Sequence, residues 1–227
     1  TAYRRQRQMC IRDRYQGDFT VADAFNEQST GESAIDHSAG SSLVVCDLSG
    51  AQLASICVFD AACSGVTPQG RTYGGAGTLH TGNLRYRYHI SDGQISCDVS
   101  SIEVYFPESD SWQPLDFHKA YSTSFTFESS QNLVSLLPWA SKMATGQALP
   151  FAPYDEATGT YMDVPSDNKS EEYYRFWAPY CRGKGVLEGT SYELKSWTAL
   201  YYYAASMNGT LSDAYTPDHL MQTRIQG

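Results

Sequence analysis

Histidines and acidic side chains are the residues from which a catalytic site in this chain would be built. The histidines are His37, His80, His89, His118 and His219. Their spacing matches no metal-ligand pattern, and neither GxSxG nor HExxH occurs. Asp–His pairs occur locally at Asp36-His37 and at Asp116 with His118. Because nucleophile triads assemble through the fold rather than the sequence, these pairs identify no enzyme, and we predict no catalytic residue, cofactor or metal.

Paired carboxylates would indicate a different chemistry, since glycosidases use two acidic side chains at a defined separation. The available residues are Glu103, Glu108, Asp110, Asp116, Glu171 and Glu172. Glu171 and Glu172 are adjacent in a predicted helix and point in different directions, so favourable charge at the helix N-terminus explains them better. Glu103 falls on the predicted solvent face of a strand. A hydrolase acting on glycans is therefore our third alternative.

Aromatic residues are unusually frequent, with 17 Tyr, 9 Phe and 4 Trp. Exposed aromatic rings bind sugars or anchor protein interfaces, although the helical spacing in residues 173–203 indicates a core. Trp112 differs because it lies in the polar turn SDSWQP. Residues 66–83 form a Gly-rich segment without a GxGxxG or Walker motif, which is either a plain surface loop or a ligand loop. The candidate ligand-binding residues are Arg71, Tyr73, His80 and Trp112.

This shortage of motifs favours a non-enzymatic interaction protein, a structural or extrinsic subunit of a larger assembly whose partner is another protein. A carbohydrate-binding module is the alternative, with Trp112 and the 66–83 segment as its glycan site. An exposed aromatic cluster around Trp112 would favour the glycan, whereas a flat apolar patch elsewhere would favour the protein partner.

The N-terminal stretch has its own composition. Residues 1–14 contain five of the sixteen basic residues: Arg4, Arg5, Arg7, Arg12 and Arg14. The run is either a basic arm for an anionic surface or, as we expect, a translated sequencing adapter that is not native. The whole chain has a formal net charge of −9, which disfavours nucleic acid as a partner. No apolar run approaches the ~18 residues of a transmembrane segment.

The cysteines and the glycosylation sequons give information about the cellular compartment of the protein. Cys46, Cys57, Cys63, Cys97 and Cys181 have no CxxC or zinc spacing, so they are buried free thiols or form one or two disulfides. Sequons begin at Asn168 and Asn208. They lean toward a secreted protein or an organelle lumen, and the sequence does not decide the localisation.

The strongest structural signal is residues 84–106, where two alternating runs flank Asp92-Gly93, a preferred type I′ hairpin turn. The turn pairs Tyr88 with Cys97 and Arg87 with Asp98, and its extrapolation pairs Tyr86 with Val99 and Arg85 with Ser100. The inward phase changes from odd to even numbers after Val99. We therefore predict a bulge at Ser100-Ser101.

The remaining pattern predicts an α+β fold, with an antiparallel sheet or sandwich over roughly 43–128 and a helical C-terminal third. Residues 15–42 form an irregular lead-in with a helical turn at 21–26, and residues 129–227 pack on the sheet, within the same domain. Residues 43–59 are ambiguous: a hairpin about Ser49-Gly50 is favoured by strand formers, while a helix over 51–63 is the alternative.

Later segments are predicted to form two strands followed by helices. Residues 112–117 form an edge strand because Pro114 lacks a donor, and residues 121–127 alternate. Residues 131–144 form a helix that Ser130 caps and Pro138 interrupts. Ser170 caps another helix, and a capping box at 190–193 predicts a third, largely buried one.

Overall fold

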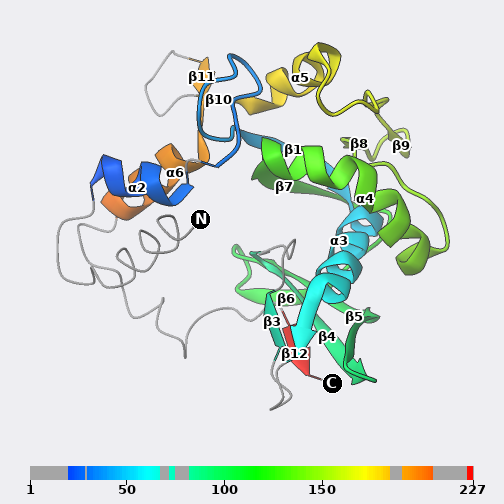
Figure 1. The fold of residues 1–227 in the computed structure, drawn as a ribbon. Coiled ribbons are helices and arrows are strands. Elements are labelled where there is room, and N and C mark those ends of the chain that lie inside the picture. The colour runs from blue at the N-terminus through cyan, green and yellow to red at the C-terminus, as the bar shows by residue number, and fades with distance from the viewer. Residues whose placement is uncertain are drawn as a thin grey trace. The chain divides into compact units, whose positions relative to one another are not determined.

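The computed structural model describes residues 20–28, 30–66, 72–74, 82–184, 191–206 and 224–226. These form an α+β fold of mainly antiparallel strands with helices, as the sequence predicted (Figure 1). The helices are α2 (Val21–Gln28), α3 (Gly50–Cys63), α4 (Phe127–Thr145), α5 (Glu171–Trp177), the 3-10 turn η1 (Ala178–Cys181) and α6 (Ser196–Ser206). The strands are β1 (Leu43–Ser49), β2 (Ser64–Val66), β3 (Thr72–Gly74), β4 (Leu84–Ser91), β5 (Gln94–Phe106), β6 (Ser111–Pro114), β7 (Ala120–Thr126), β8 (Tyr154–Asp155), β9 (Thr160–Tyr161), β10 (Arg182–Lys184), β11 (Ser191–Glu193) and β12 (Arg224–Gln226).

The chain divides into two compact units, which we describe separately. The first unit comprises residues up to 45, 124–129 and 169–220, and the second comprises 46–123, 130–168 and 221–227. The division falls inside β1, β7 and α4, so these elements contribute residues to both units. β1 and β7 together form a two-stranded sheet.

The second unit contains the largest described sheet, in the order β12-β4-β5-β6. β4 and β5 form the predicted hairpin, and Asp92 and Gly93 adopt the positive φ values, 52° and 75°, that a type I′ turn requires. The pairs Tyr88–Cys97 and Arg87–Asp98 confirm the predicted register next to the turn.

The predicted register is wrong beyond Arg87. Leu84 pairs with Val104 and Arg85 with Glu103, because the ladder shifts between Arg85 and Arg87. The predicted bulge is therefore confirmed, but it takes up more residues of β5 than a single-residue bulge would. Ile102 is buried on the restored inward face, as the phase change indicated.

The hairpin favoured for residues 43–59 is also wrong, because β1 is followed directly by the helix α3. Ser49 caps α3: its side chain accepts the Gln52 backbone N–H while the Gln52 side chain accepts the Ser49 N–H. Gln52 Nε2 also donates to the carbonyl oxygens of Pro150 and Ala152, each at 2.8 Å. These bonds satisfy polar groups that burial would otherwise penalise.

α3 begins where the chain passes very close to a neighbouring loop. The Gly50 and Ala51 N–H groups donate to the carbonyls of Lys119 and Phe117. A Cβ atom on Gly50 would lie 2.0 Å from the Asp116 carbonyl oxygen, so only glycine fits. From there α3 packs on β4 and β5 (Figure 1).

α4 begins earlier than predicted, at Phe127, so Ser130 lies inside the helix rather than at its cap. Its first turn is preceded by β7, where Tyr121, Thr123 and Phe125 share the less exposed face, as the alternation indicated. The helix continues through Pro138 to Thr145.

In the first unit, α2 packs against α6 (Figure 1). Ser170 caps α5 as predicted, and its Oγ accepts the Tyr173 N–H. The capping box predicted at 190–193 is wrong: residues 191–193 form β11, which pairs with β10, and α6 begins at Ser196. Aromatic rings fill this unit, and Phe127 contacts both Tyr173 and Tyr174.

Candidate functional site

The four residues predicted to bind a ligand differ in how far the structure describes them. Arg71 and His80 lie outside the described residues, and Tyr73 lies in β3, where its backbone pairs with Gly65. Trp112 lies on β6, whose neighbour in the sheet is β5. The predicted Trp112 site can therefore be examined through β4, β5 and β6.

Trp112 belongs to a cluster on one face of the sheet. Tyr105 is its cross-strand partner, with ring centroids 5.3 Å apart. The Arg85 guanidinium lies over the Trp112 ring, 4.1 Å from its centroid, and its Nε donates to Glu103 at 2.7 Å. Arg85 is thus held by a cation–π contact and by an ion pair.

This arrangement bears on sugar binding. A sugar stacks on the flat face of an aromatic ring, but Arg85 already occupies one face of Trp112. The Tyr105 hydroxyl in turn donates to Asp110 at 2.7 Å. One face of Trp112 and the Tyr105 hydroxyl are therefore already engaged within the protein. A glycan would have to displace Arg85 or use the other face of Trp112.

A second candidate surface lies on α4 and was not identified from the sequence. The side chains of Leu136, Trp139 and Met143 follow one another at spacings of three and four residues, which places them on one helical face. Their residues are 39%, 52% and 59% exposed. An apolar stripe two turns long therefore faces outward on this helix.

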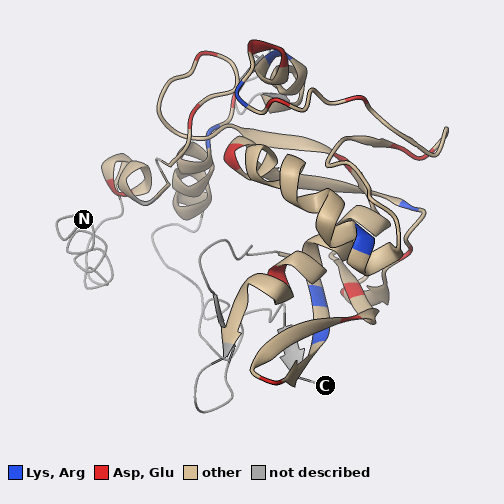
Figure 2. Cartoon of the chain, turned by 45° about the vertical axis from the view of Figure 1, so that its right-hand side comes forward, with Lys and Arg blue, Asp and Glu red and all other residues tan. Residues whose placement is uncertain are grey.

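The adjacent, buried face of α4 shows why this stripe is unusual. Leu133, Leu137 and Ala140 are buried, together with Ser141, and they supply the packing that holds the helix. A surface helix of this kind normally presents polar and charged residues on its other side. In residues 130–145, Lys142 is the single charged residue, and α4 is tan over most of its length in Figure 2. The exposed face is consequently more apolar than water contact alone would favour.

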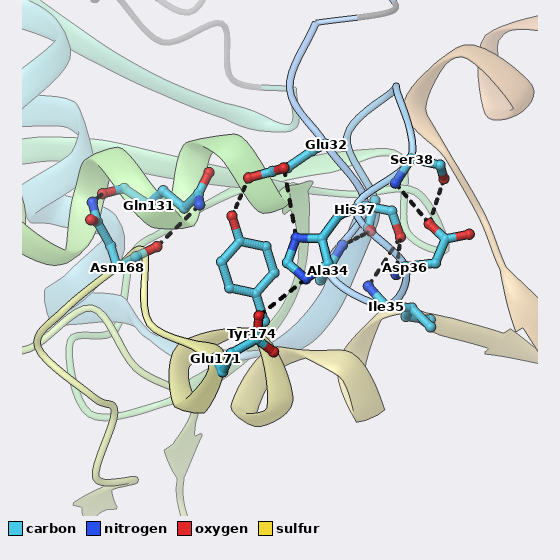
Figure 3. Close-up of polar contacts among 12 residues, drawn as sticks. Glu32, Ala34, Ile35, Asp36, His37, Ser38, Gln131, Asn168, Glu171 and Tyr174 are labelled. Carbon is cyan, nitrogen blue, oxygen red and sulfur yellow. Dashed lines mark hydrogen bonds and ion pairs between the residues drawn. The ribbon is translucent and has the colours of Figure 1, made fainter.

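Figure 3 shows a histidine between two carboxylates in the first unit. His37 Nδ1 lies 3.7 Å from Glu32 Oε2, and His37 Nε2 lies 3.5 Å from Glu171 Oε1. The ring stacks on Tyr174 with centroids 4.5 Å apart, and the Tyr174 hydroxyl donates to Glu32. His37 itself has a left-handed backbone, with φ of 58°.

This histidine cluster is better explained as a structural contact between two segments than as a catalytic centre. Imidazole and carboxylates can exchange protons, but the His37 side chain is 46% exposed and that of Glu171 is 70% exposed. Water therefore weakens their electrostatic interaction. The contacts join residues 31–40 to α5 within the first unit.

Asp36, the predicted partner of His37, is engaged elsewhere. Its carboxylate accepts the backbone N–H and the hydroxyl of Ser38 (Figure 3). The Ser38 hydroxyl bond, followed by the backbone bond, lowers the pKa of Asp36 to about 2. Asp36 therefore stabilises its own turn and does not orient His37 for catalysis.

The described cysteines are free thiols, so the disulfide alternative is not realised. Burial raises the pKa of Cys46, Cys97 and Cys181 to about 12, and it also raises that of Cys57. A nucleophilic cysteine needs a lowered pKa, because the thiolate is the reactive form. Cys46, Cys57 and Cys181 are core residues, whereas Cys97 is partly exposed. No group of three or more metal-ligating side chains occurs among the described residues.

The sequon at Asn168 lies in a polar contact of its own. The Asn168 side-chain amide donates to the carbonyl of Gln131, and Gln131 Nε2 donates to the Asn168 carbonyl at 3.1 Å (Figure 3). This pair fastens the segment before α5 to α4 within the second unit. The other sequon, at Asn208, lies outside the described residues. In the part of the chain that is described, no helix is long and apolar enough to cross a membrane.

Comparison with known proteins gives one distant likeness. No protein-family model matches the chain, and no curated protein matches it. The NAD nucleotidase of Haemophilus influenzae aligns with 16% sequence identity and a TM-score of 0.35. The alignment covers 72% of this chain and 24% of that protein. At this TM-score the likeness carries no conclusion about fold, substrate or activity.

Proposed function

We propose that this protein is a non-enzymatic subunit that binds another protein through the exposed face of α4. The observation that carries the proposal is the outward stripe of Leu136, Trp139 and Met143, with Trp139 52% exposed. Tryptophan is among the residues that most often dominate interface energies, and methionine adapts its shape to a partner. An apolar face on a helix at this spacing is also a recurrent mode of recognition.

Two further observations support a binding role over an enzymatic one. The histidine cluster is open to water. Cys46, Cys57 and Cys181 are buried, and the pKa of each described thiol is raised, including those of the partly exposed Cys63 and Cys97. The predicted carboxylate Glu103 is paired with Arg85. None of these groups has the free and sheltered arrangement that a hydrolase would use.

Glycan binding at Trp112 remains the second candidate because Trp112 and Tyr105 lie together on one sheet face. Arg85 covers one face of the Trp112 ring, which lowers the area open to a sugar. Trp139 has no such cover from a described cation, and it is therefore the better anchor.

The test is an affinity capture with the full chain and two matched variants, Trp139→Ala and Trp112→Ala. A protein partner is expected to be retained by the wild type and by Trp112→Ala. Truncating a hot-spot tryptophan costs about 2 kcal/mol or more, so Trp139→Ala should weaken binding roughly 30-fold. Circular dichroism of both variants controls for folding. Loss of the partner in Trp112→Ala alone, or recovery of polysaccharide in place of protein, would refute the proposal.

A further inference from the structure

The exposed face of α4 also carries information about the shape of its partner, if the proposed function holds. Leu136 and Met143 are seven residues apart, so the stripe is about 10.5 Å long at ~1.5 Å per residue. This is two helical turns, a length over which one helix packs along another through rows of residues three and four apart. The three anchors therefore fit a single helix better than a broad, flat surface.

The charge on the same face further restricts which kinds of partner can bind. Lys142 is exposed and directly precedes Met143, and it lies three residues after Trp139, so it borders the stripe. Among the described residues, no hydrogen bond or ion pair engages the Lys142 ammonium group. The other exposed residues on this face, Asn132 and Ser135, are uncharged. Within residues 130–145, a carboxylate on the partner would thus find one cation and no anion on this face. The other charged residue of α4, Glu128, lies two turns before Leu136.

A second copy of the chain is a poor occupant for this face. The formal net charge is −9, so two copies repel one another. A stable interface also buries about 800 Å² on each partner, far more than three partly exposed side chains supply. A transient contact with a short helical segment of a different protein can bury less area than this, and such a segment need not carry a large negative charge.

We propose that the exposed face of α4 binds an amphipathic helix of a partner protein. The apolar stripe of that helix covers Leu136, Trp139 and Met143, and an Asp or Glu on its flank pairs with Lys142. This assignment rests on the proposed function and adds the class of ligand to it.

Two synthetic helical peptides test the assignment with the full chain. Both carry the same Leu-rich face, and they differ only in having Glu or Lys at the flanking positions. Fluorescence anisotropy measures the affinity of each peptide in 0.15 M salt, where charges more than about 8 Å apart are largely screened. The net charge of −9 by itself favours the Lys-flanked peptide. A local contact with Lys142 favours the Glu-flanked peptide, so the two explanations predict opposite orders of affinity.

Charge reversal then locates the contact. We expect the Glu-flanked peptide to bind the wild type about two- to fivefold more tightly than the Lys-flanked one, the range of an exposed ion pair. Lys142→Glu should invert that order. Arg87→Glu is the matched control, because it makes the same change in net charge at an exposed position on β4, and it should leave the order unchanged. Trp139→Ala should weaken both peptides.

Two results would overturn the inference. The first is equal binding of the two peptides to the wild type, and the second is an equal effect of Lys142→Glu and Arg87→Glu. Failure of the inference is distinguishable from failure of the proposed function. If Trp139→Ala still loses the native partner while the peptides show no charge preference, the docking face stands and the acidic helix is wrong. If Trp139→Ala keeps the native partner, the docking face itself is wrong.

Discussion

Leu136 and Leu137, two neighbouring leucines of α4, test which face of the helix is exposed and which is buried. Leu137 is fully buried, whereas Leu136, the preceding residue, is 39% exposed. Each is replaced by alanine, so the chemical change is the same and only the surroundings differ. The assignment of the docking face requires that the two variants lose very different amounts of stability.

The magnitude follows from burial. Leucine to alanine removes three carbon groups, worth about 2.4 kcal/mol at ~0.8 kcal/mol for each buried group. At Leu137 a cavity adds to this, so the free energy of unfolding should fall by about 2.5–5 kcal/mol. At Leu136 the buried part of the side chain corresponds to at most about 1.5 kcal/mol, and water fills the space that is left.

Urea unfolding followed by circular dichroism measures both variants against the wild type. Helix content at zero urea shows whether each variant is folded, and the slope against urea shows whether the same surface is exposed on unfolding. A loss at Leu136→Ala equal to or greater than that at Leu137→Ala would refute the face assignment. The proposals that depend on Leu136, Trp139 and Met143 would then lose their basis.

Three further predictions concern the backbone, a carboxylate and a thiol. Gly50→Ala should destabilise the protein by several kcal/mol in thermal melts, because its Cβ would lie 2.0 Å from a carbonyl oxygen, while Gly82→Ala, with open space around it, should stay within about 0.5 kcal/mol. Ser38→Ala should raise the pKa of Asp36 from about 2 toward its ordinary 3.8 in an NMR titration. Because folding lowers this pKa, the wild type gains stability above pH 3.8 and loses it as the pH falls toward 2, and the variant should show a weaker dependence because the Ser38 backbone N–H bond remains; an unchanged pKa would contradict the assigned hydroxyl bond. Iodoacetamide should label the fully buried Cys57 only after denaturant is added, and rapid labelling of the native protein would contradict its burial.

The hairpin at residues 84–106 was predictable because turn chemistry and side-chain alternation point to the same register. Tyr88 pairs with Cys97 as the turn dictates. The register farther from the turn was not predictable, because the sequence shows that a phase change occurs but not how many residues it absorbs. Arg85 therefore pairs with Glu103 rather than with Ser100.

The predicted hairpin in place of α3 was wrong for a physical reason. The helix is buried over nearly all of its length, so its apolar residues do not repeat at the period of an amphipathic helix. Ile56, Val58 and Phe59 favour strands, but tertiary packing overrides such propensities. Ser49 was considered as the cap of the alternative helix, and the overlooked signal was Gln52 three residues later, which completes the capping box that the structure contains.

The α4 surface could have been found from the sequence by placing the apolar residues of this segment on the faces of a helix. Leu133 and Leu137 define one apolar face, and Leu136, Trp139 and Met143 define another. A surface helix normally has one apolar stripe, so a second stripe is either buried as well or exposed as a surface suited to a partner. Which face is buried depends on packing against other elements, and only the structure supplies it.

Photo-crosslinking from the helix tests the central claim most directly. A benzoylphenylalanine replaces Trp139 in one preparation and Trp112 in another, and each full chain is irradiated in an extract of its source organism. We predict that position 139 forms a discrete adduct with one protein near equal stoichiometry, and that position 112 does not. An adduct from position 112 with none from position 139 would contradict the account and move the binding surface to the β4–β5–β6 sheet.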